Sequence, residues 1–384
     1  MAPLWSLIHN PALLIERLYG GEFNDAGARM SNARAHTPLV WILKGPKAGD
    51  YAQLRALADM IGWPFETRQL VFRRFELFLH ARPRPTLAAV DRSASDPLQA
   101  PWPDLLLTAG RRNELVARFV RDASGGRTRL VHVGRPWSHP RHFDLVVSSR
   151  QYLLDADARV LVNDLPLHDI SVESLAPERA RWEPRLAHLP RPWTVLLTGG
   201  NSGPLVFTPA RARELARRVN ALMARTPGSV LLSTSARTPR RSAAALLESL
   251  RTPGFIFQFP SAAENPYRGL LACGDRFIVT GDSMSMLAEA CGTGKPVYLY
   301  DFSDPGPWWR DASAYQWKPL VHRLAMSIGP RRMRRDVRVI HRALLAAGRV
   351  RLLDVSGDAG PRVEGASADE ELKRTAARVR SLLE

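Results

Sequence analysis

The sequence predicts an α/β protein made of two doubly wound, Rossmann-like domains that face each other across a cleft. Short apolar runs alternate with longer amphipathic stretches, which is the pattern of a parallel sheet covered by helices on both faces. This pattern restarts near residue 190, and 384 residues are enough for two domains. An apolar content of 45% excludes a disordered chain, and two cysteines exclude a disulfide-rich scaffold.

The first series of elements lies before residue 188. We expect strands at 38–43, 104–108, 130–133, 143–147 and 159–162. A Gly-rich turn leads to a helix at about 50–61, and a second helix follows Gly110 and runs through Val120. The segment 185–193 carries two prolines and is typical of a linker between domains.

The second series repeats this order. We expect strands at 194–198, 229–233, 254–257, 276–280 and 297–300, with helices at about 209–224, 239–250 and 283–291. The predicted domains are therefore 1–188 and 189–330, followed by C-terminal helices over 331–384 that pack back on the N-terminal domain. Residues 354–365 are expected to be a loop. Ser367 and Glu370 have the spacing of a capping box for a final, charged helix on the surface.

The chain is strongly basic, with 54 Lys and Arg against 37 Asp and Glu and a formal net charge of +17. Either this charge reflects only an arginine-rich composition on a solvated surface, or it helps the protein to bind an anionic membrane surface, phosphate-bearing substrates or nucleic acid. Nucleic acid is the weakest of these because no helix-turn-helix, zinc-finger or ribonucleoprotein motif is present. No apolar run reaches the roughly 18 residues of a membrane span. We expect a cytoplasmic protein that can attach peripherally to the inner face of the cytoplasmic membrane.

Ligands of doubly wound sheets bind where strands end and helices begin, and four such turns stand out. The first spans residues 45–50 (GPKAGD) and includes two glycines that let a ligand approach the backbone. Lys47 can neutralise an anion, and Asp50 can either cap the helix or act as a base on an acceptor hydroxyl. The glycines match neither the P-loop nor the dinucleotide fingerprint.

The second and third turns follow the first two strands of the second series. Residues 198–203 (TGGNSG) form a loop whose amides can face a phosphate, with Gly200, Asn201 and Ser202 as candidate contacts. Residues 233–239 (STSARTP) place several hydroxyls and one guanidinium at a helix start. Thr238 is the expected cap, and Thr234, Ser235 and Arg237 are candidates for holding a diphosphate.

The fourth turn gives the sharpest pattern, TGDSMSMLAEA at 280–290. Hydroxyls of Ser283 and Ser285, with the free amides of a helix start, can hold phosphate oxygens, and the neighbouring Asp282 is a further candidate binding residue. Glu289 lies four residues after Ser285 and therefore shares its helix face, where a carboxylate can accept both hydroxyls of a ribose. A well-capped helix with a solvated glutamate is the alternative.

The sequences of these turns resemble those of known protein families. The second half resembles the nucleotide-sugar domain of GT-B glycosyltransferases, in which a Ser-rich turn binds the donor phosphates and a helix-borne glutamate binds the ribose. More specifically, the chain is similar to the mitochondrial-fission (elongated-mitochondria) protein family and its bacterial homologues. The segments that carry this likeness are GPKAGDYAQ, PDLLLTAGRR, GGRTRLVHVGRP, FDLVV, LLTGG, LLSTSARTP and ENPYRGLLACGDRFIVTGDSMSMLAEACGTGKPVYLY, within residues 38–302.

The resemblance implies a GT-B-like fold, with the acceptor side in the first domain and the donor side in the second. It also implies that Asn265 and Tyr267 line the wall around the base of the nucleotide. Many relatives have His at the position of Asp50, which puts a catalytic base there in doubt. His132, Arg135 and His168 are weaker candidates, His132 being more typical of a buried strand residue.

Three functions follow from this reading. The first is a metal-independent glycosyltransferase that uses a nucleoside-diphosphate sugar, preferably a UDP-sugar, with an envelope glycan or a lipid-linked acceptor. Its catalytic candidates are Asp50, Lys47 and Arg237, with no separate cofactor. The second is a non-catalytic nucleotide-sugar binder or membrane scaffold like the plant family member, and the third is a sugar-nucleotide epimerase. No His, Asp and Glu cluster has metal-ligand spacing.

Overall fold

The computed structural model describes residues 37–73, 85–155, 157–202, 205–252, 254–302, 328, 335–353 and 368–384. The expected loop at 354–365 and Ser367 of the expected capping box lie outside these ranges. None of the helices in the described ranges is long and apolar enough to cross a bilayer.

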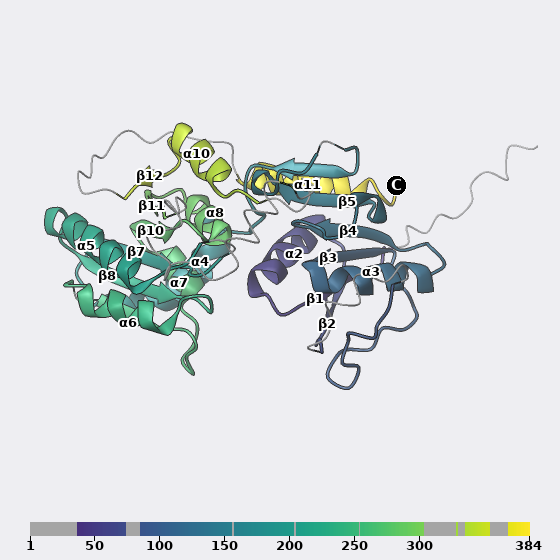
Figure 1. Cartoon of the computed structure of the whole chain (residues 1–384), viewed down its shortest axis with the longest axis horizontal. Helices are drawn as coiled ribbons and strands as arrows, with labels where there is room; N and C mark the ends of the chain where they lie inside the picture. Colours follow the sequence, from purple (N-terminus) through teal and green to yellow (C-terminus); the bar gives the residue numbers. More distant parts are fainter. Residues whose placement is uncertain are drawn as a thin grey trace, which may run out of the picture. The chain divides into compact units, whose positions relative to one another are not determined.

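The first half contains one six-stranded sheet in which every strand pair is parallel (Figure 1). Its strand order is β2-β1-β3-β4-β5-β6. The bounds are β1 Val40–Lys44, β2 Phe65–Gln69, β3 Leu105–Ala109, β4 Arg129–Val133, β5 Leu145–Ser149 and β6 Val160–Asn163. Helices α2 (Ala48–Ile61) and α3 (Arg111–Ala123) pack on opposite faces, each against its own hydrophobic cluster. The five strands expected from apolar runs are present, and β2 is an additional polar edge strand.

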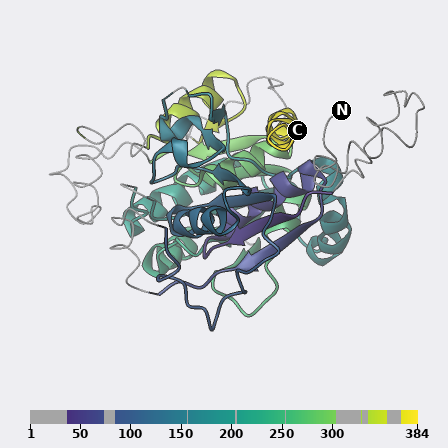
Figure 2. The ribbon, with the colours of Figure 1, turned by 90° about the vertical axis from the view of Figure 1, so that its right-hand side faces the viewer.

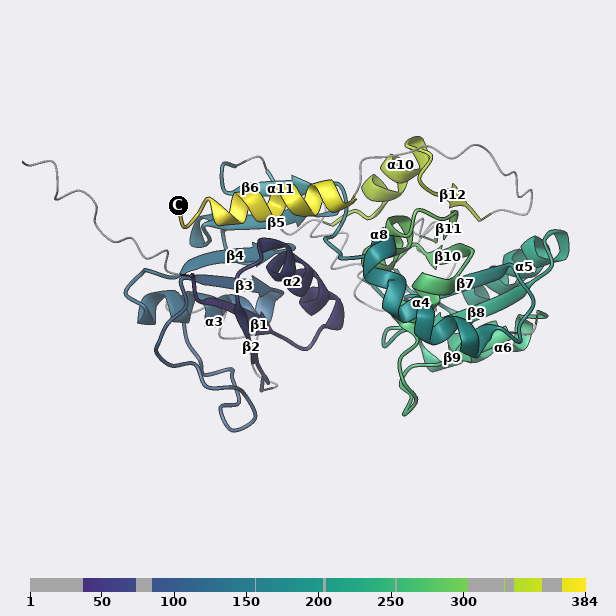
Figure 3. The same ribbon diagram turned by 180° about the vertical axis from the view of Figure 1, so that it is seen from behind.

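The second half contains another six-stranded parallel sheet, with strand order β12-β11-β10-β7-β8-β9 (Figure 3). Its strands are β7 Trp193–Thr198, β8 Ser229–Thr234, β9 Gly254–Phe257, β10 Arg276–Thr280, β11 Val297–Tyr300 and β12 Arg351–Leu352. Its helices include α5 Pro209–Arg225, α6 Arg240–Ser249, α7 Tyr267–Cys273, α8 Met284–Gly292 and α10 Arg338–Ala346. The α/β fold class with two doubly wound, Rossmann-like halves is therefore confirmed.

Helix α4 (Val172–Leu186) corrects the expected start of the linker. The prolines Pro177 and Pro184 lie inside this helix, and such residues normally argue against a helix. The sequence before Trp193 therefore looked more irregular than it is. Leu175, Trp182 and Leu186 are buried in the core of the second half, where α4 packs on α7.

Helix α11 (Ala368–Arg380) is the final helix expected from the sequence, and one of its faces is buried in the first half rather than lying on the surface. Leu372, Ala376 and Val379 are buried in the cluster that α2 shares with the first sheet. Arg380 donates hydrogen bonds to the carbonyls of Ile61 and Met60, at 3.0 and 2.7 Å, and so satisfies free carbonyls at the end of α2. Figure 2 shows this helix nearly end-on, in yellow.

The strand orders fix where ligands can bind. In the first sheet the order changes direction between β1 and β3, and in the second sheet it changes direction between β7 and β10. Loops that leave the carboxyl ends of such neighbouring strands diverge to opposite faces and leave a crevice, which is the usual ligand site of an open α/β sheet. The turns at residues 45–50, 199–202 and 280–285 all lie at these two points.

Candidate functional site

The turn after β7 requires its two glycines. Gly200 has φ +139°, and a Cβ on it would lie 2.0 Å from the carbonyl oxygen of Arg237. A Cβ on Gly199 would lie 2.3 Å from Oδ2 of Asp282. Any side chain at either position would therefore displace the backbone or the buried carboxylate. The glycines allow three loops to meet closely at the switch point of the second sheet.

Asp282 joins these loops from inside the protein. Its side chain is fully buried, and its carboxylate accepts hydrogen bonds from the Gly200 amide at 2.9 Å and the Thr280 hydroxyl at 2.8 Å. Arg237 Nη1 lies 2.8 Å from Oδ2 of the same carboxylate. Burial raises the pKa of Asp282, and the Arg237 charge is the largest influence that opposes this rise. Asp282 thus faces the turn and its arginine, which makes it a positioning residue.

The hydroxyl-rich turn after β8 is tied to the glycine turn. The Thr238 hydroxyl donates to the Gly199 carbonyl at 2.6 Å, and the Ser235 hydroxyl donates to the same carbonyl. The expected role of Thr238 as the cap of α6 is wrong, because Pro239 occupies the N-cap position and the helix begins at Arg240. Thr238 instead closes its own turn by accepting a hydrogen bond from the Ser235 amide at 3.0 Å.

Three other predicted contacts have partners within the protein. The Thr234 hydroxyl accepts a hydrogen bond from the Phe259 amide at 2.9 Å. The Asn201 side-chain oxygen accepts one from the Phe207 amide at 2.9 Å. The Ser202 hydroxyl accepts one from Arg335 at 3.0 Å.

These bonds fix the loops around the glycine turn. The Arg237 guanidinium, which pairs with Asp282, also donates to the Asn201 carbonyl at 3.4 Å, and its side chain is 39% exposed.

Helix α8 starts at the edge of this network. Ser283 occupies its N-cap position and makes no side-chain capping bond, although its side chain is largely buried. The first amides of a helix have no partner inside it, and together with the helix dipole they favour an anion. Ser285 lies in the first turn of α8 and is partly exposed. The amides and the two hydroxyls together can hold phosphate oxygens.

Glu289 lies further along α8 and has a partner that the sequence did not reveal. The Tyr267 hydroxyl, at the start of α7, donates a hydrogen bond to Oε2 of Glu289. Burial raises the pKa of Glu289 to about 7, and the bond from Tyr267 opposes that rise. The Asn265 side chain accepts a hydrogen bond from the Tyr267 amide at 3.1 Å and so orders the start of α7. The predicted ribose and base contacts are therefore neighbours.

The turn after β1 lies at the switch point of the first sheet. Helix α2 begins at Ala48 with exposed Lys47 at its N-cap position, so the possible role of Asp50 as a cap is wrong. The Asp50 carboxylate reaches the neighbouring turn after β3, because a Cβ on Gly110 would lie 2.9 Å from its Oδ2. Burial raises the pKa of Asp50, which Lys47 and then His132 oppose. A carboxyl with a raised pKa is suited to accept a proton from a hydroxyl.

Two residues that stabilise the loops at this switch point, Asn113 and Glu114, were not predicted from the sequence. Asn113 donates from Nδ2 to the Leu43 carbonyl at 2.9 Å and lies against Gly45. Glu114 is 1% exposed and accepts hydrogen bonds from the Trp137 amide at 2.6 Å and from the amide and hydroxyl of Ser138, at 2.9 and 2.6 Å. Both lie in the first turn of α3, directly after Arg111 and Arg112.

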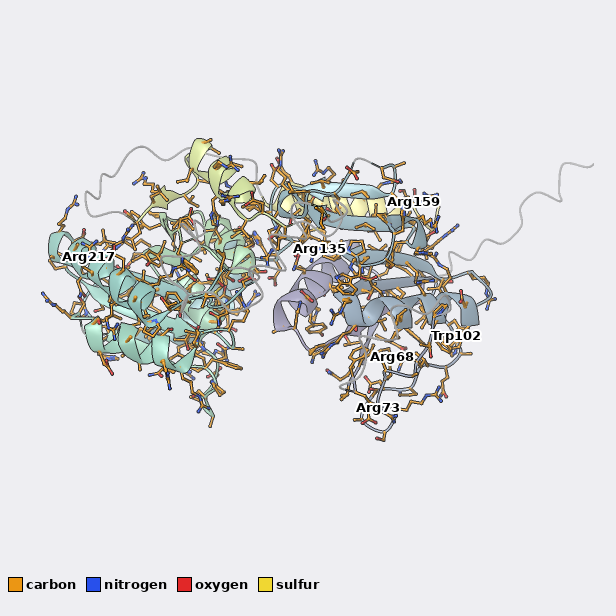
Figure 4. All side chains as sticks on the ribbon, in the orientation of Figure 1. Arg68, Arg73, Trp102, Arg135, Arg159 and Arg217 are labelled. Carbon is orange, nitrogen blue, oxygen red and sulfur yellow. The ribbon has the colours of Figure 1, made fainter. Side chains whose placement is uncertain are left out.

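The weaker candidates from the sequence were His132, His168 and Arg135. His132 is fully buried on β4, as its interpretation as a buried strand residue predicted. His168 is also buried, which lowers its pKa to about 4, and its Nδ1 accepts from the Ile170 amide at 3.2 Å. Arg135, labelled in Figure 4, lies with its guanidinium carbon 5.8 Å from the centre of the Tyr152 ring. In the described ranges, no group of three or more His, Cys, Asp and Glu side chains is arranged to hold a metal ion.

Together, the two sheets and their turns define an α/β protein of the doubly wound class with Gly- and Ser-rich loops at its switch points. The family model for "Mitochondrial fission ELM1" matches residues 48–317, and the chain belongs to this family. The resemblance seen in the sequence is thereby confirmed.

Two curated relatives extend this result. The Mitochondrial fission protein ELM1 of Arabidopsis thaliana is 29% identical over 219 residues, 51% of this chain and 51% of the relative. The chain thus spans about half the length of that relative. An uncharacterized protein of Rickettsia prowazekii is 22% identical over 299 residues, 68% of this chain and 82% of its own.

Solved structures that are similar to this chain share little sequence identity with it. A glycosyltransferase from Rickettsia africae has a TM-score of 0.44 and 11% identity, covering 91% of this chain and 99% of its own. An Anabaena protein in complex with UDP-glucose has a TM-score of 0.44 and 12% identity, covering 90% and 100%. The UDP-GlcNAc 2-epimerase from Methanocaldococcus jannaschii has a TM-score of 0.43 and 12% identity, covering 90% and 99%.

Proposed function

We propose that this protein is a GT-B-type glycosyltransferase that moves a sugar from a nucleoside-diphosphate sugar, with a UDP-sugar as donor, to an envelope glycan or a lipid-linked acceptor. The observation that carries the proposal is the meeting of three anion-suited turns at the switch point of the second sheet, held together by Asp282. Such prearranged donors are suited to a diphosphate that leaves with its charge.

The donor would lie along the second sheet. The diphosphate would bind the amides at the start of α8, the hydroxyls of Ser283 and Ser285, and the partly exposed guanidinium of Arg237. The ribose would bind Glu289, and the base would lie near Asn265 and Tyr267. Arg237 and the α8 dipole would stabilise the negative charge that develops on the leaving diphosphate.

The acceptor would approach the first sheet near Asp50. Its hydroxyl oxygen would form a bond to the sugar carbon while the bond from that carbon to the diphosphate breaks. The Asp50 carboxylate would take the hydroxyl proton, for which its raised pKa is suited. Lys47, at the exposed start of α2, would attract an anionic group of the acceptor.

A thermal-shift experiment tests the donor site. We expect UDP or UDP-sugars to raise the melting temperature of the wild-type protein, and Glu289→Ala to remove most of that rise. Glu248→Ala, an exposed glutamate on α6, is the matched control and should keep the rise. If no nucleotide or nucleotide sugar stabilises the wild type, the donor-site proposal fails.

Family membership supports a second candidate, a protein that binds a nucleotide sugar without turnover and acts as a scaffold at an anionic membrane surface. The net charge of +17 suits such a surface, and a peripheral position on the inner face of the cytoplasmic membrane fits both candidates. Donor hydrolysis, measured with and without candidate acceptors, separates the two. Stabilisation by a UDP-sugar without release of UDP under any acceptor condition would favour the scaffold.

A further inference from the structure

An exposed tryptophan in the first half lies on a loop that a buried carboxylate fixes. Trp137 follows β4 and is 38% exposed, although tryptophan side chains are usually buried over most of their surface. The Trp137 amide, together with the amide and hydroxyl of Ser138, donates to Glu114, which is 1% exposed. These three hydrogen bonds offset the burial of a charged group. They hold the backbone of Trp137 in one position while its ring remains accessible.

An arginine covers one face of this ring. The guanidinium carbon of Arg111 lies 4.6 Å from the centre of the Trp137 ring, which is a cation–π contact. Arg111 is the first residue of α3, where the helix dipole disfavours a cation, so helix stability does not account for this residue. A guanidinium binds carboxylate or phosphate through N–H groups in its own plane, and stacking on an aromatic ring therefore does not compete with anion binding.

The pair of Arg111 and Trp137 lies beside the proposed acceptor position. Arg111 directly follows Gly110, and a Cβ on Gly110 would lie 2.9 Å from Oδ2 of Asp50. The loops that carry Gly110 and Trp137 leave the carboxyl ends of β3 and β4, which are neighbouring strands. An acceptor that touches the indole can therefore extend along Arg111 towards the carboxylate that we propose as the base.

The surroundings of Trp137 indicate what kind of ligand fits it. Its neighbours in residues 134–142 are Gly, Arg, Pro, Ser and His, which do not form the contiguous apolar area of a membrane anchor. A single indole beside a guanidinium instead offers a small, flat apolar surface next to a cation. The C–H face of a sugar ring matches this surface, and a phosphate or carboxylate matches the cation. The other exposed large apolar side chains in the described ranges lie on other elements: Val71, Val162, Val172, Ile256, Phe259, Ile328 and Leu352.

We propose that Trp137 and Arg111 form an acceptor subsite, in which the exposed part of the indole packs against a sugar ring and the guanidinium binds a phosphate or carboxylate group of the same acceptor. The inference rests on the proposed function, because it places this subsite beside the proposed base. It narrows the acceptor to an anionic saccharide. Glu114 is a positioning residue, since it touches the loop that carries Trp137 and not the acceptor.

The indole N–H signal of Trp137 reports binding directly. In protein labelled with ¹⁵N-tryptophan, Trp137→Phe assigns this signal. We expect saturable shifts with N-acetylglucosamine 1-phosphate or glucuronic acid, and at least about tenfold weaker binding of neutral N-acetylglucosamine, which lacks the charge. A response to either anionic sugar supports the proposal and identifies the anionic group. The signal of Trp102, which packs against Trp41 with ring centres 6.0 Å apart, should not shift.

Two variants separate the parts of the subsite, with binding followed on the NMR signals of the sugar. Arg111→Gln should weaken binding of the anionic sugar about tenfold, whereas Arg112→Gln, at the exposed neighbouring position, should change it less than about twofold. Trp137→Leu should abolish binding of charged and neutral sugars alike. Trp137 is anchored through its backbone amide, so its variants should fold, and an unchanged melting temperature checks this.

Equal affinity for anionic and neutral sugars, or equal losses in Arg111→Gln and Arg112→Gln, would overturn the proposal. It would also be overturned if vesicles of acidic phospholipid shift the Trp137 signal and neither anionic sugar does, because this surface would then be a membrane contact. These measurements use no nucleotide and are independent of the donor experiments. If the sugars bind and no nucleotide stabilises the protein, the proposed function fails and a saccharide site remains. If UDP stabilises the protein and no sugar binds, only the subsite fails.

Discussion

Replacing Glu289 by Gln should stabilise the ligand-free protein at alkaline pH while weakening nucleotide binding. Burial raises the pKa of this carboxyl from 4.5 to about 7, so the folded chain holds a proton that the unfolded chain releases. A raised native pKa gives stability that is present in full below pH 4.5 and is lost as the pH rises to about 7. Gln cannot ionise and is free of this loss.

The size of the effect follows from the shift. Each pKa unit corresponds to about 1.4 kcal/mol. At pH 8 the wild type has lost nearly the whole contribution of Glu289, and at pH 5 it has lost about 0.8 kcal/mol. The free energy of unfolding of Glu289→Gln relative to wild type should therefore rise by about 2.5 kcal/mol between pH 5 and pH 8. Using the difference between two pH values cancels the change in the hydrogen bond to Tyr267.

Urea unfolding at both pH values, followed by tryptophan fluorescence, measures this difference. Glu248→Gln on α6 is the matched control, because Glu248 is exposed and should give the same relative stability at both pH values. If Glu289→Gln shows the same change relative to wild type at pH 5 and pH 8, the carboxyl is not held with a raised pKa. The reasoning about its burial beside Tyr267 would then be refuted.

Three further outcomes are expected. Gly200→Ala should lower the free energy of unfolding by about 2–4 kcal/mol, measured by urea unfolding, because the new Cβ would collide with a backbone carbonyl. Gly294→Ala, at φ +66° in open space, should lower it by only about 1–2 kcal/mol, and equal losses would contradict the steric argument. Asp282→Asn should weaken UDP binding about tenfold, as measured by calorimetry, because it removes the charge that holds the Arg237 guanidinium in place. An unchanged Kd would count against a positioning role for Asp282. Leu372→Ala should lower the free energy of unfolding by about 2–5 kcal/mol, because Leu372 is buried where α11 packs on the first half. Lys373→Ala, at an exposed position on the same helix, should lower it by less than about 0.5 kcal/mol, and similar values for both would argue against packing of α11 there.

The strands could be predicted because each buried parallel strand is a continuous apolar run, as in residues 194–198 and 276–280. Two elements that were missed, β2 and α4, break that rule. Strand β2 is polar because it lies at a sheet edge, and α4 contains two prolines. Helix α11 looked like a charged surface helix, yet Leu372, Ala376 and Val379 recur at spacings of four and three residues. That recurrence was the available signal for a buried face.

The candidate turns could be predicted for a topological reason, since Gly- and Ser-rich loops follow the strands that flank each switch point. The sequence could not tell which way a side chain points. Asp282 precedes α8 and Glu289 lies within it, and only the structure shows that the first accepts a hydrogen bond from the Gly200 amide and the second accepts one from Tyr267. The buried Glu114 had no distinguishing pattern, because a glutamate in a first helical turn is ordinary.

The arrangement of charge in the second half bears on the meaning of the basic composition. Arg237 and Asp282 form a pair whose charges cancel, so the diphosphate binding that we propose would depend largely on backbone amides and the α8 dipole. Many other arginines are spread over separate elements, as Arg68, Arg159 and Arg217 illustrate in Figure 4. Arg68 and Arg217 are paired with neighbouring glutamates. The net charge of +17 is therefore not needed to explain the proposed site, in which anion binding would depend on loop geometry that Gly199, Gly200 and the buried Asp282 maintain.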